Sequence, residues 1–137
     1  MYLTQTQIMY NVLIVDDSSM NQLFLSSVAK LMGCNICVAE NGKEAVSKSM
    51  LVRYDLIFMD FEMPILKGDL ATLIIRQKGN LNSNTPIILQ SSSFYDEQIS
   101  MENNSFTEQI SKPYVLSQVK NIIKKYTSGE QHILSVA

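Results

Sequence analysis

The sequence lacks the features that mark membrane, secreted and nucleic-acid-binding proteins. Its apolar runs are far shorter than the roughly 20 residues that a membrane helix needs. Residues 1–10 show no basic segment followed by an apolar core, so we expect no secretory signal. The formal net charge of −2 provides no broad basic surface for nucleic acid or an anionic membrane. We therefore expect a cytoplasmic protein that binds neither nucleic acid nor a membrane directly.

Cysteine and histidine are also scarce. Cys34 and Cys37 follow a predicted helix end and enter a strand-like run, where residues three apart point to opposite faces. We therefore interpret them as core thiols rather than as a redox pair. A zinc-type site would need further cysteine or histidine ligands, and the single histidine, His132, lies in a polar tail.

What the chain does contain is a series of short apolar runs that alternate with segments of helical periodicity. Its 137 residues are 46% apolar and 18% charged, which is typical of one globular domain. Alternating strands and helices predict a parallel sheet with right-handed crossovers. Five such units fit a flavodoxin-like, doubly wound α/β fold with strand order 2-1-3-4-5. We predict strands at residues 12–15, 35–39, 55–59, 86–90 and near 110, and helices at 18–32, 43–52, 68–78 and from Pro113 onward.

Apolar residues recur at helical spacing in each predicted helix, and we expect these positions to face the core. The segment 92–109 shows no clean helical stripe, so we expect a helix there to be short or mobile. The expected inward positions are Met20, Leu23, Phe24, Val28 and Leu31; Ala45, Val46 and Met50; Leu70, Leu73 and Ile74; and Val115, Leu116, Val119, Ile122, Ile123 and Tyr126.

Polar and charged residues follow four of the predicted strands. Asp16 and Asp17 close the first strand, Asp60 the third, Ser91 the fourth, and Lys112 the fifth. Because the carboxyl ends of parallel strands lie on one side of the sheet, we expect these residues to converge where open α/β sheets bind ligands.

The chemistry of this edge points to phosphoryl transfer. Carboxylates close together in a partly desolvated site repel one another, and Mg²⁺ relieves that repulsion by taking oxygen ligands. A lysine and a serine hydroxyl suit phosphoryl oxygens, and a carboxylate can itself accept the phosphoryl group.

With these residues at the ends of its predicted strands, the chain resembles a response-regulator receiver domain over residues 11–126. The resemblance implies a CheY-like version of the fold, with residues 1–10 as an N-terminal extension and 127–137 as a tail too short for an output domain. The motifs that carry it, through their order and spacing, are Val15-Asp16-Asp17, the run 59–64 (Met-Asp-Phe-Glu-Met-Pro) with Gly68, Pro86-Ile87-Ile88 leading to Ser91, and Ser111-Lys112-Pro113.

The resemblance implies a phosphorylation site and a metal site at this edge. Asp60 would be phosphorylated by a phosphohistidine donor. Mg²⁺ would be bound by Asp17, by Asp60 and by the backbone carbonyl of Glu62, with Asp16 acting mostly through metal-bound water. Such a domain is not an enzyme in the usual sense, because it catalyses only its own phosphorylation and dephosphorylation.

The resemblance also assigns roles to Lys112 and Ser91, which would each bind a phosphoryl oxygen. Counting from the fourth strand favours Ser91 over the two serines that follow it. A cis bond between Lys112 and Pro113 is implied as well. One position departs from the family pattern, because Gln109 stands where an aromatic residue is usual, so we expect weaker coupling or coupling through a neighbour such as Phe106.

A receiver implies partners: a histidine kinase or a histidine phosphotransfer protein as donor, and a downstream protein target. The resemblance leaves homodimerisation open. The alternative is a pseudo-receiver, a protein-interaction module without phosphotransfer, which Gln109 mildly favours. A Mg²⁺-dependent phosphatase with an aspartyl nucleophile fits less well, because such enzymes usually carry aspartate where this chain has Glu62.

Overall fold

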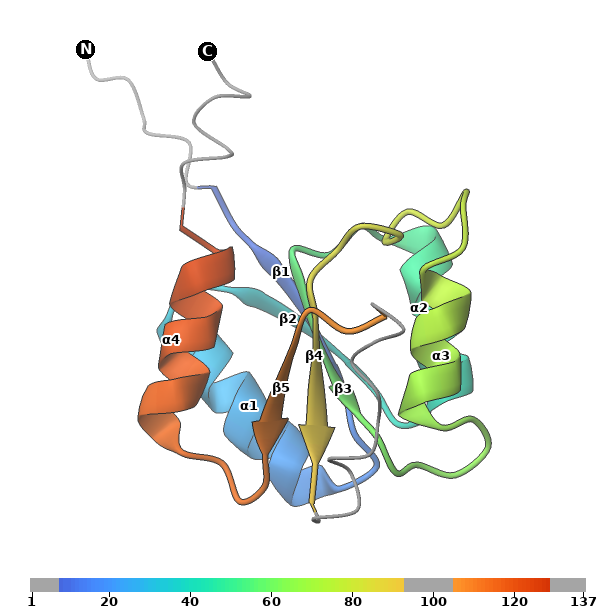
Figure 1. Cartoon of the computed structure of the whole chain (residues 1–137). Coiled ribbons are helices and arrows are strands. Elements are labelled where there is room, and N and C mark those ends of the chain that lie inside the picture. Colours follow the sequence, from blue (N-terminus) through green and yellow to red (C-terminus); the bar gives the residue numbers. More distant parts are fainter. Residues whose placement is uncertain (1–7, 93–104, 129–137) are drawn as a thin grey trace, which may run out of the picture.

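Strands and helices alternate along the chain as far as the fourth strand, and five parallel strands form one sheet that helices cover on both faces (Figure 1). The computed structural model describes residues 8–92 and 105–128. The strands lie in the order β2-β1-β3-β4-β5, which confirms the predicted doubly wound fold. The elements are β1 (Asn11–Val15), α1 (Ser19–Leu31), β2 (Asn35–Ala39), α2 (Gly42–Leu51), β3 (Leu56–Asp60), α3 (Gly68–Ile75), β4 (Ile87–Ser91), β5 (Glu108–Ser111) and α4 (Leu116–Tyr126).

Helices α1 and α4 cover one face of the sheet, and α2 and α3 cover the other (Figure 1). Successive strand residues point to opposite faces, so Phe58 packs with α1 and α4 while Met59 packs with α2 and α3. Strands β3 and β4 are buried along their whole length because strands flank them and helices cover them. Cys34 and Cys37 follow the same alternation, contact opposite core clusters and are free thiols, as predicted.

The helix ends carry the local signals that the sequence suggests. The Ser18 hydroxyl caps α1 by accepting the Asn21 N–H at 3.4 Å. After α1, Gly33 turns the chain with φ of 84°, a left-handed conformation that glycine adopts without strain. The Asn41 side chain caps α2 by accepting the Glu44 N–H at 2.8 Å. Within the described ranges, no helix is both long and apolar enough to cross a membrane.

The predicted inward face of α1 is partly wrong. Met20, Leu23 and Leu31 are 81%, 69% and 83% exposed. The helix instead packs through Leu25, Ser26, Val28 and Ala29. Small side chains on the packed face let the helix backbone approach the sheet. A prediction that considers only large apolar residues therefore selects the wrong helix face.

The same error recurs in the other helices. The small residues Ala45 and Ala71 are fully buried, while larger apolar neighbours face outward. The expectation holds for Val28, Ala45, Val119, Ile122 and Ile123, which are buried, and in part for Phe24, Val46, Ile74 and Tyr126. It is wrong for Met50, Leu70, Leu73, Val115 and Leu116, which are exposed.

The final helix begins later than predicted. Pro113 does not open α4; Val115 is extended (φ −100°, ψ 120°), and the helix starts at Leu116. The Lys112–Pro113 bond is cis, as the family resemblance implied. The helix expected within residues 92–109 falls mainly on residues 93–104, which lie outside the described residues. Phe106, just after them, is buried against the α2–α3 side of the sheet.

Candidate functional site

The carboxyl edge of the sheet brings its charged residues together through strand alternation. In β3, Asp60 points to the same face as Phe58, the face that α1 and α4 cover. The hydrogen-bond ladder extends one residue beyond β1 and β5, because the Asp16 N–H donates to the Ala39 carbonyl at 3.1 Å and the Lys112 N–H to the Ser91 carbonyl at 2.7 Å. Asp16, Asp60 and Lys112 therefore share one face at one edge.

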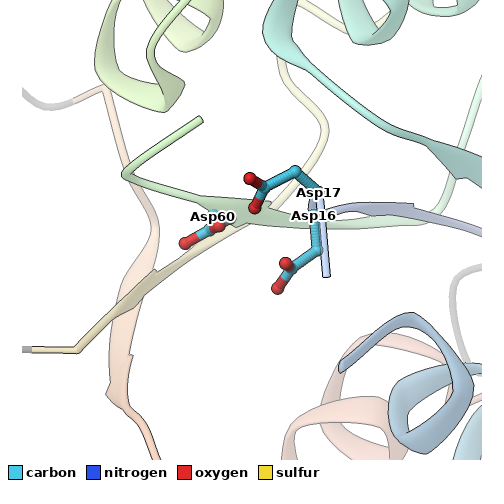
Figure 2. Close-up of side chains that lie close together, drawn as sticks. All are labelled: Asp16, Asp17 and Asp60. Carbon is cyan, nitrogen blue, oxygen red and sulfur yellow. The ribbon is translucent and has the colours of Figure 1, made fainter. Parts of the chain in front are cut away.

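Three carboxylates form the centre of the site (Figure 2). Asp16, Asp17 and Asp60 each offer an oxygen atom, and these atoms lie within 4.8 Å of one another. Asp16 is completely buried and Asp60 is 4% exposed, whereas Asp17 faces solvent. Burial raises the pKa of Asp60 to about 6; the hydrogen bond from Lys112 opposes this, and the charges of Asp16 and Asp17 reinforce it. The cluster thus concentrates negative charge that a cation would relieve.

Lys112 supplies the positive charge of the site. Its Nζ atom donates to Asp60 Oδ1 at 2.9 Å and lies 3.2 Å from Asp16 Oδ2. Although burial lowers the pKa of Lys112, the bonds to Asp60 and Asp16 outweigh it and leave that pKa above its usual value. The ammonium group is therefore held charged beside the acids, where it can contact an anion attached to Asp60.

Ser91 lies at the end of β4, 4% exposed. Its Oγ atom accepts a hydrogen bond from Gln109 Nε2 at 3.0 Å. Ser91 directly follows Gln90, the register partner of Asp60. By strand alternation its side chain starts on the face of Leu89, opposite the face of Phe58 and Asp60.

The loop between β3 and α3 closes against the end of β3. A side chain on Gly68 would place its Cβ atom 2.0 Å from the Asp60 carbonyl oxygen, so only glycine fits this approach. The Gly68 N–H also donates to the Phe61 carbonyl at 2.9 Å. Glu62 lies within this loop with its carboxylate 3.9 Å from Lys67 Nζ, and both side chains are more than half exposed. The side chain of Glu62 therefore points to solvent.

Sequence reasoning missed two residues beside the acids. Gln90 is completely buried, and its Oε1 atom accepts a hydrogen bond from the Tyr114 hydroxyl. The same hydroxyl lies 3.4 Å from Asp16 Oδ2, and the Tyr114 ring stacks on Phe24 with 5.5 Å between centroids. Burial raises the pKa of Tyr114, and the charges of Asp16 and Asp60 add to it. A polar glutamine inside an otherwise apolar strand was the signal available in the sequence.

The carboxyl edge of this doubly wound sheet thus holds three clustered carboxylates and a lysine. The model of the response regulator receiver domain matches residues 12–124. The chain belongs to this family and is a receiver domain of two-component signalling.

Proteins similar to this chain include both kinases and a transcription factor. Hybrid signal transduction histidine kinase G of Dictyostelium discoideum is 34% identical over 127 residues, and transcription factor SKN7 of Saccharomyces cerevisiae is 29% identical over 118 residues. The matches cover 90% and 85% of this chain but only 4% and 18% of those proteins. The chain is thus similar to one segment of each.

Among solved structures, response regulator TrrA of Thermotoga maritima superposes with a TM-score of 0.76 at 29% identity. The superposition covers 86% of this chain and 99% of that one. Because almost the whole of that chain matches, its fold corresponds to the fold described here.

Proposed function

We propose that Asp60 accepts a phosphoryl group from a phosphohistidine donor in a Mg²⁺-dependent reaction. The observation that carries the proposal is the placement of a buried carboxylate 2.9 Å from the Lys112 ammonium, with two further carboxylates within 4.8 Å. A carboxylate in this position is a suitable covalent acceptor, and its surroundings can hold the charge that arrives with a phosphoryl group.

The residues of the site fit Mg²⁺. The ion prefers oxygen ligands and keeps several waters while binding one or two carboxylates. Asp17 and Asp60 would bind it directly with the backbone carbonyl of Glu62, and Asp16 would act through a metal-bound water. When bound, the ion supplies positive charge against the phosphoryl oxygens. The structure of TrrA, which is 29% identical, was solved in complex with Mg²⁺ and BeF, which supports the proposal.

The transfer itself exchanges one bond for another. A carboxylate oxygen of Asp60 attacks the phosphorus atom, an O–P bond forms, the P–N bond breaks, and its electron pair stays on the imidazole nitrogen of the donor. Lys112 would bind one phosphoryl oxygen and the Ser91 hydroxyl another. Catalysis then consists of positioning and charge stabilisation. Hydrolysis of the acyl phosphate at the same site would return the domain to its resting state.

The donor would be a histidine kinase or a histidine phosphotransfer protein in the cytoplasm, and the phosphorylated surface would bind a downstream protein. Similarity to a hybrid histidine kinase and to a transcription factor supports such a relay. The signalling unit would be residues 11–126. Phosphorylation adds negative charge at the sheet edge and thereby biases the domain between two conformations.

Acetyl phosphate with Mg²⁺ tests the proposal without a cognate kinase. We expect the intact mass to rise by one phosphoryl group in wild type and not in Asp60→Asn or in EDTA. Asp55→Asn is the matched control, because Asp55 lies just before the opposite end of β3, where its carboxylate accepts the Asn11 N–H at 2.8 Å. If wild type gains no more mass than Asp60→Asn on treatment with acetyl phosphate, and beryllofluoride produces no response, the pseudo-receiver alternative is established.

A further inference from the structure

Gln109 contacts the serine of the proposed phosphoryl site from the neighbouring strand. In the parallel pairing of β4 with β5, Gln109 is the register partner of Leu89. Ser91 lies two residues beyond Leu89 on the same face of β4. The Gln109 side chain reaches diagonally across and donates from Nε2 to Ser91 Oγ at 3.0 Å. Because Ser91 is 4% exposed, water competes little for this bond.

The direction of this hydrogen bond determines what the serine can still do. A hydroxyl has one proton to donate and two lone pairs, and an amide N–H can only donate. Gln109 therefore occupies a lone pair of Ser91 and does not use its O–H. A hydroxyl that accepts a hydrogen bond is polarised and becomes a better donor. A phosphoryl group on Asp60 presents only acceptor oxygens. The Ser91 O–H, as a donor, suits such an oxygen.

We propose that Gln109 is a positioning residue that holds Ser91 as a hydrogen-bond donor toward the phosphoryl group on Asp60. This proposal rests on the proposed function of Asp60. Gln109 then speeds transfer and lengthens the lifetime of the acyl phosphate without touching the acids. The competing possibility is a brake, in which Gln109 restrains a serine that must move away before it can bind the phosphoryl group.

Two substitutions at this position separate these roles. Gln109→Met keeps the length of the side chain but removes the donor. Gln109→Glu keeps the shape of the side chain and replaces the donor with an acceptor. The new carboxylate would accept a hydrogen bond from the Ser91 O–H, which could then no longer donate to the phosphoryl group. The rate of phosphorylation by acetyl phosphate at saturating Mg²⁺ and the rate of loss of the phosphoryl group are measured for each. Gln118→Ala, an exposed glutamine on α4, is the matched control.

For Gln109→Met we expect phosphorylation to slow about 3- to 10-fold, the range that one partly buried hydrogen bond provides. Gln109→Glu should slow phosphorylation more than Gln109→Met does, and Gln118→Ala should be phosphorylated at the rate of wild type. The affinity for Mg²⁺, measured by titration calorimetry, should be unchanged in Gln109→Met because Gln109 acts through Ser91 and not through the carboxylates. Urea unfolding of each variant verifies that the fold is intact.

A double-mutant cycle provides the decisive comparison. In a Ser91→Ala background, Gln109→Met should have no further effect on the rate of phosphorylation or on the rate of loss of the phosphoryl group. An equal effect with and without Ser91, or faster phosphorylation in Gln109→Met, would overturn the proposal, and the latter result would identify a brake. If wild type is phosphorylated and Gln109→Met matches it, only the role of Gln109 fails. If wild type is not phosphorylated, the proposed function fails.

Discussion

Asp60→Asn should stabilise the metal-free protein at neutral pH. Burial, reinforced by the charges of Asp16 and Asp17, raises the pKa of Asp60 from its ordinary value of 3.8 to about 6 despite the bond from Lys112. An acid whose pKa is higher in the folded state binds more protons when folded between those two values. The free energy of unfolding therefore falls as the pH rises from about 4 to about 6. Above about pH 6, burial of the ionised Asp60 carboxylate lowers the free energy of unfolding by its full amount.

The size of the effect follows from the two pKa values. The difference between 3.8 and about 6 corresponds to about 3 kcal/mol. In EDTA at about pH 7.5, Asp60→Asn should thus be more stable than wild type by up to about 3 kcal/mol, and the gap should close as the pH falls toward about 4. Urea unfolding followed by circular dichroism across this range measures both quantities.

Two comparisons make the test specific. Asp55→Asn removes a charge near the other end of the same strand, where the carboxylate accepts a backbone N–H, and should not stabilise. Mg²⁺ at about 100 times its dissociation constant should add about 2.7 kcal/mol to wild type and remove most of the advantage of the variant. If Asp60→Asn is no more stable than wild type at neutral pH, or if its advantage does not vary with pH, the electrostatic reasoning is refuted.

Three further predictions concern packing and hydrogen bonding. Asn82→Ala removes a buried amide that makes four hydrogen bonds and should cost about 3–5 kcal/mol in urea unfolding, whereas the exposed Asn84→Ala should cost under about 0.5. Leu25→Ala should cost about 2–5 kcal/mol and Leu23→Ala about 0.5 or less, because only the first is buried; similar losses would contradict the observed helix face. Gly68→Ala should cost at least about 2 kcal/mol and slow phosphorylation, because its Cβ atom would overlap a backbone carbonyl; an unchanged melting temperature and rate would contradict this.

Much of the fold follows from local patterns in the sequence. The apolar run that ends at Asp60 gives β3 within a residue or two, and the turn and cap residues bound the first two helices closely. Parallel topology then brings the strand ends to one edge, which is why Asp16, Asp17, Asp60 and Lys112 could be grouped before their distances were known. The helix faces were less predictable, because which stripe packs depends on how closely the backbone approaches the sheet.

Periodicity and the common direction of parallel strands were enough to predict the acidic edge and the lysine beside it. The strand order was the one that belongs to the doubly wound fold which the pattern fits. The contacts among the site residues, in contrast, became known only from the folded chain. The contact of Gln109 with Ser91, and that of Tyr114 with Gln90 and Asp16, joins side chains far apart in the chain. Such contacts depend on side-chain direction across strands and on the space that packing leaves, and no local pattern encodes either.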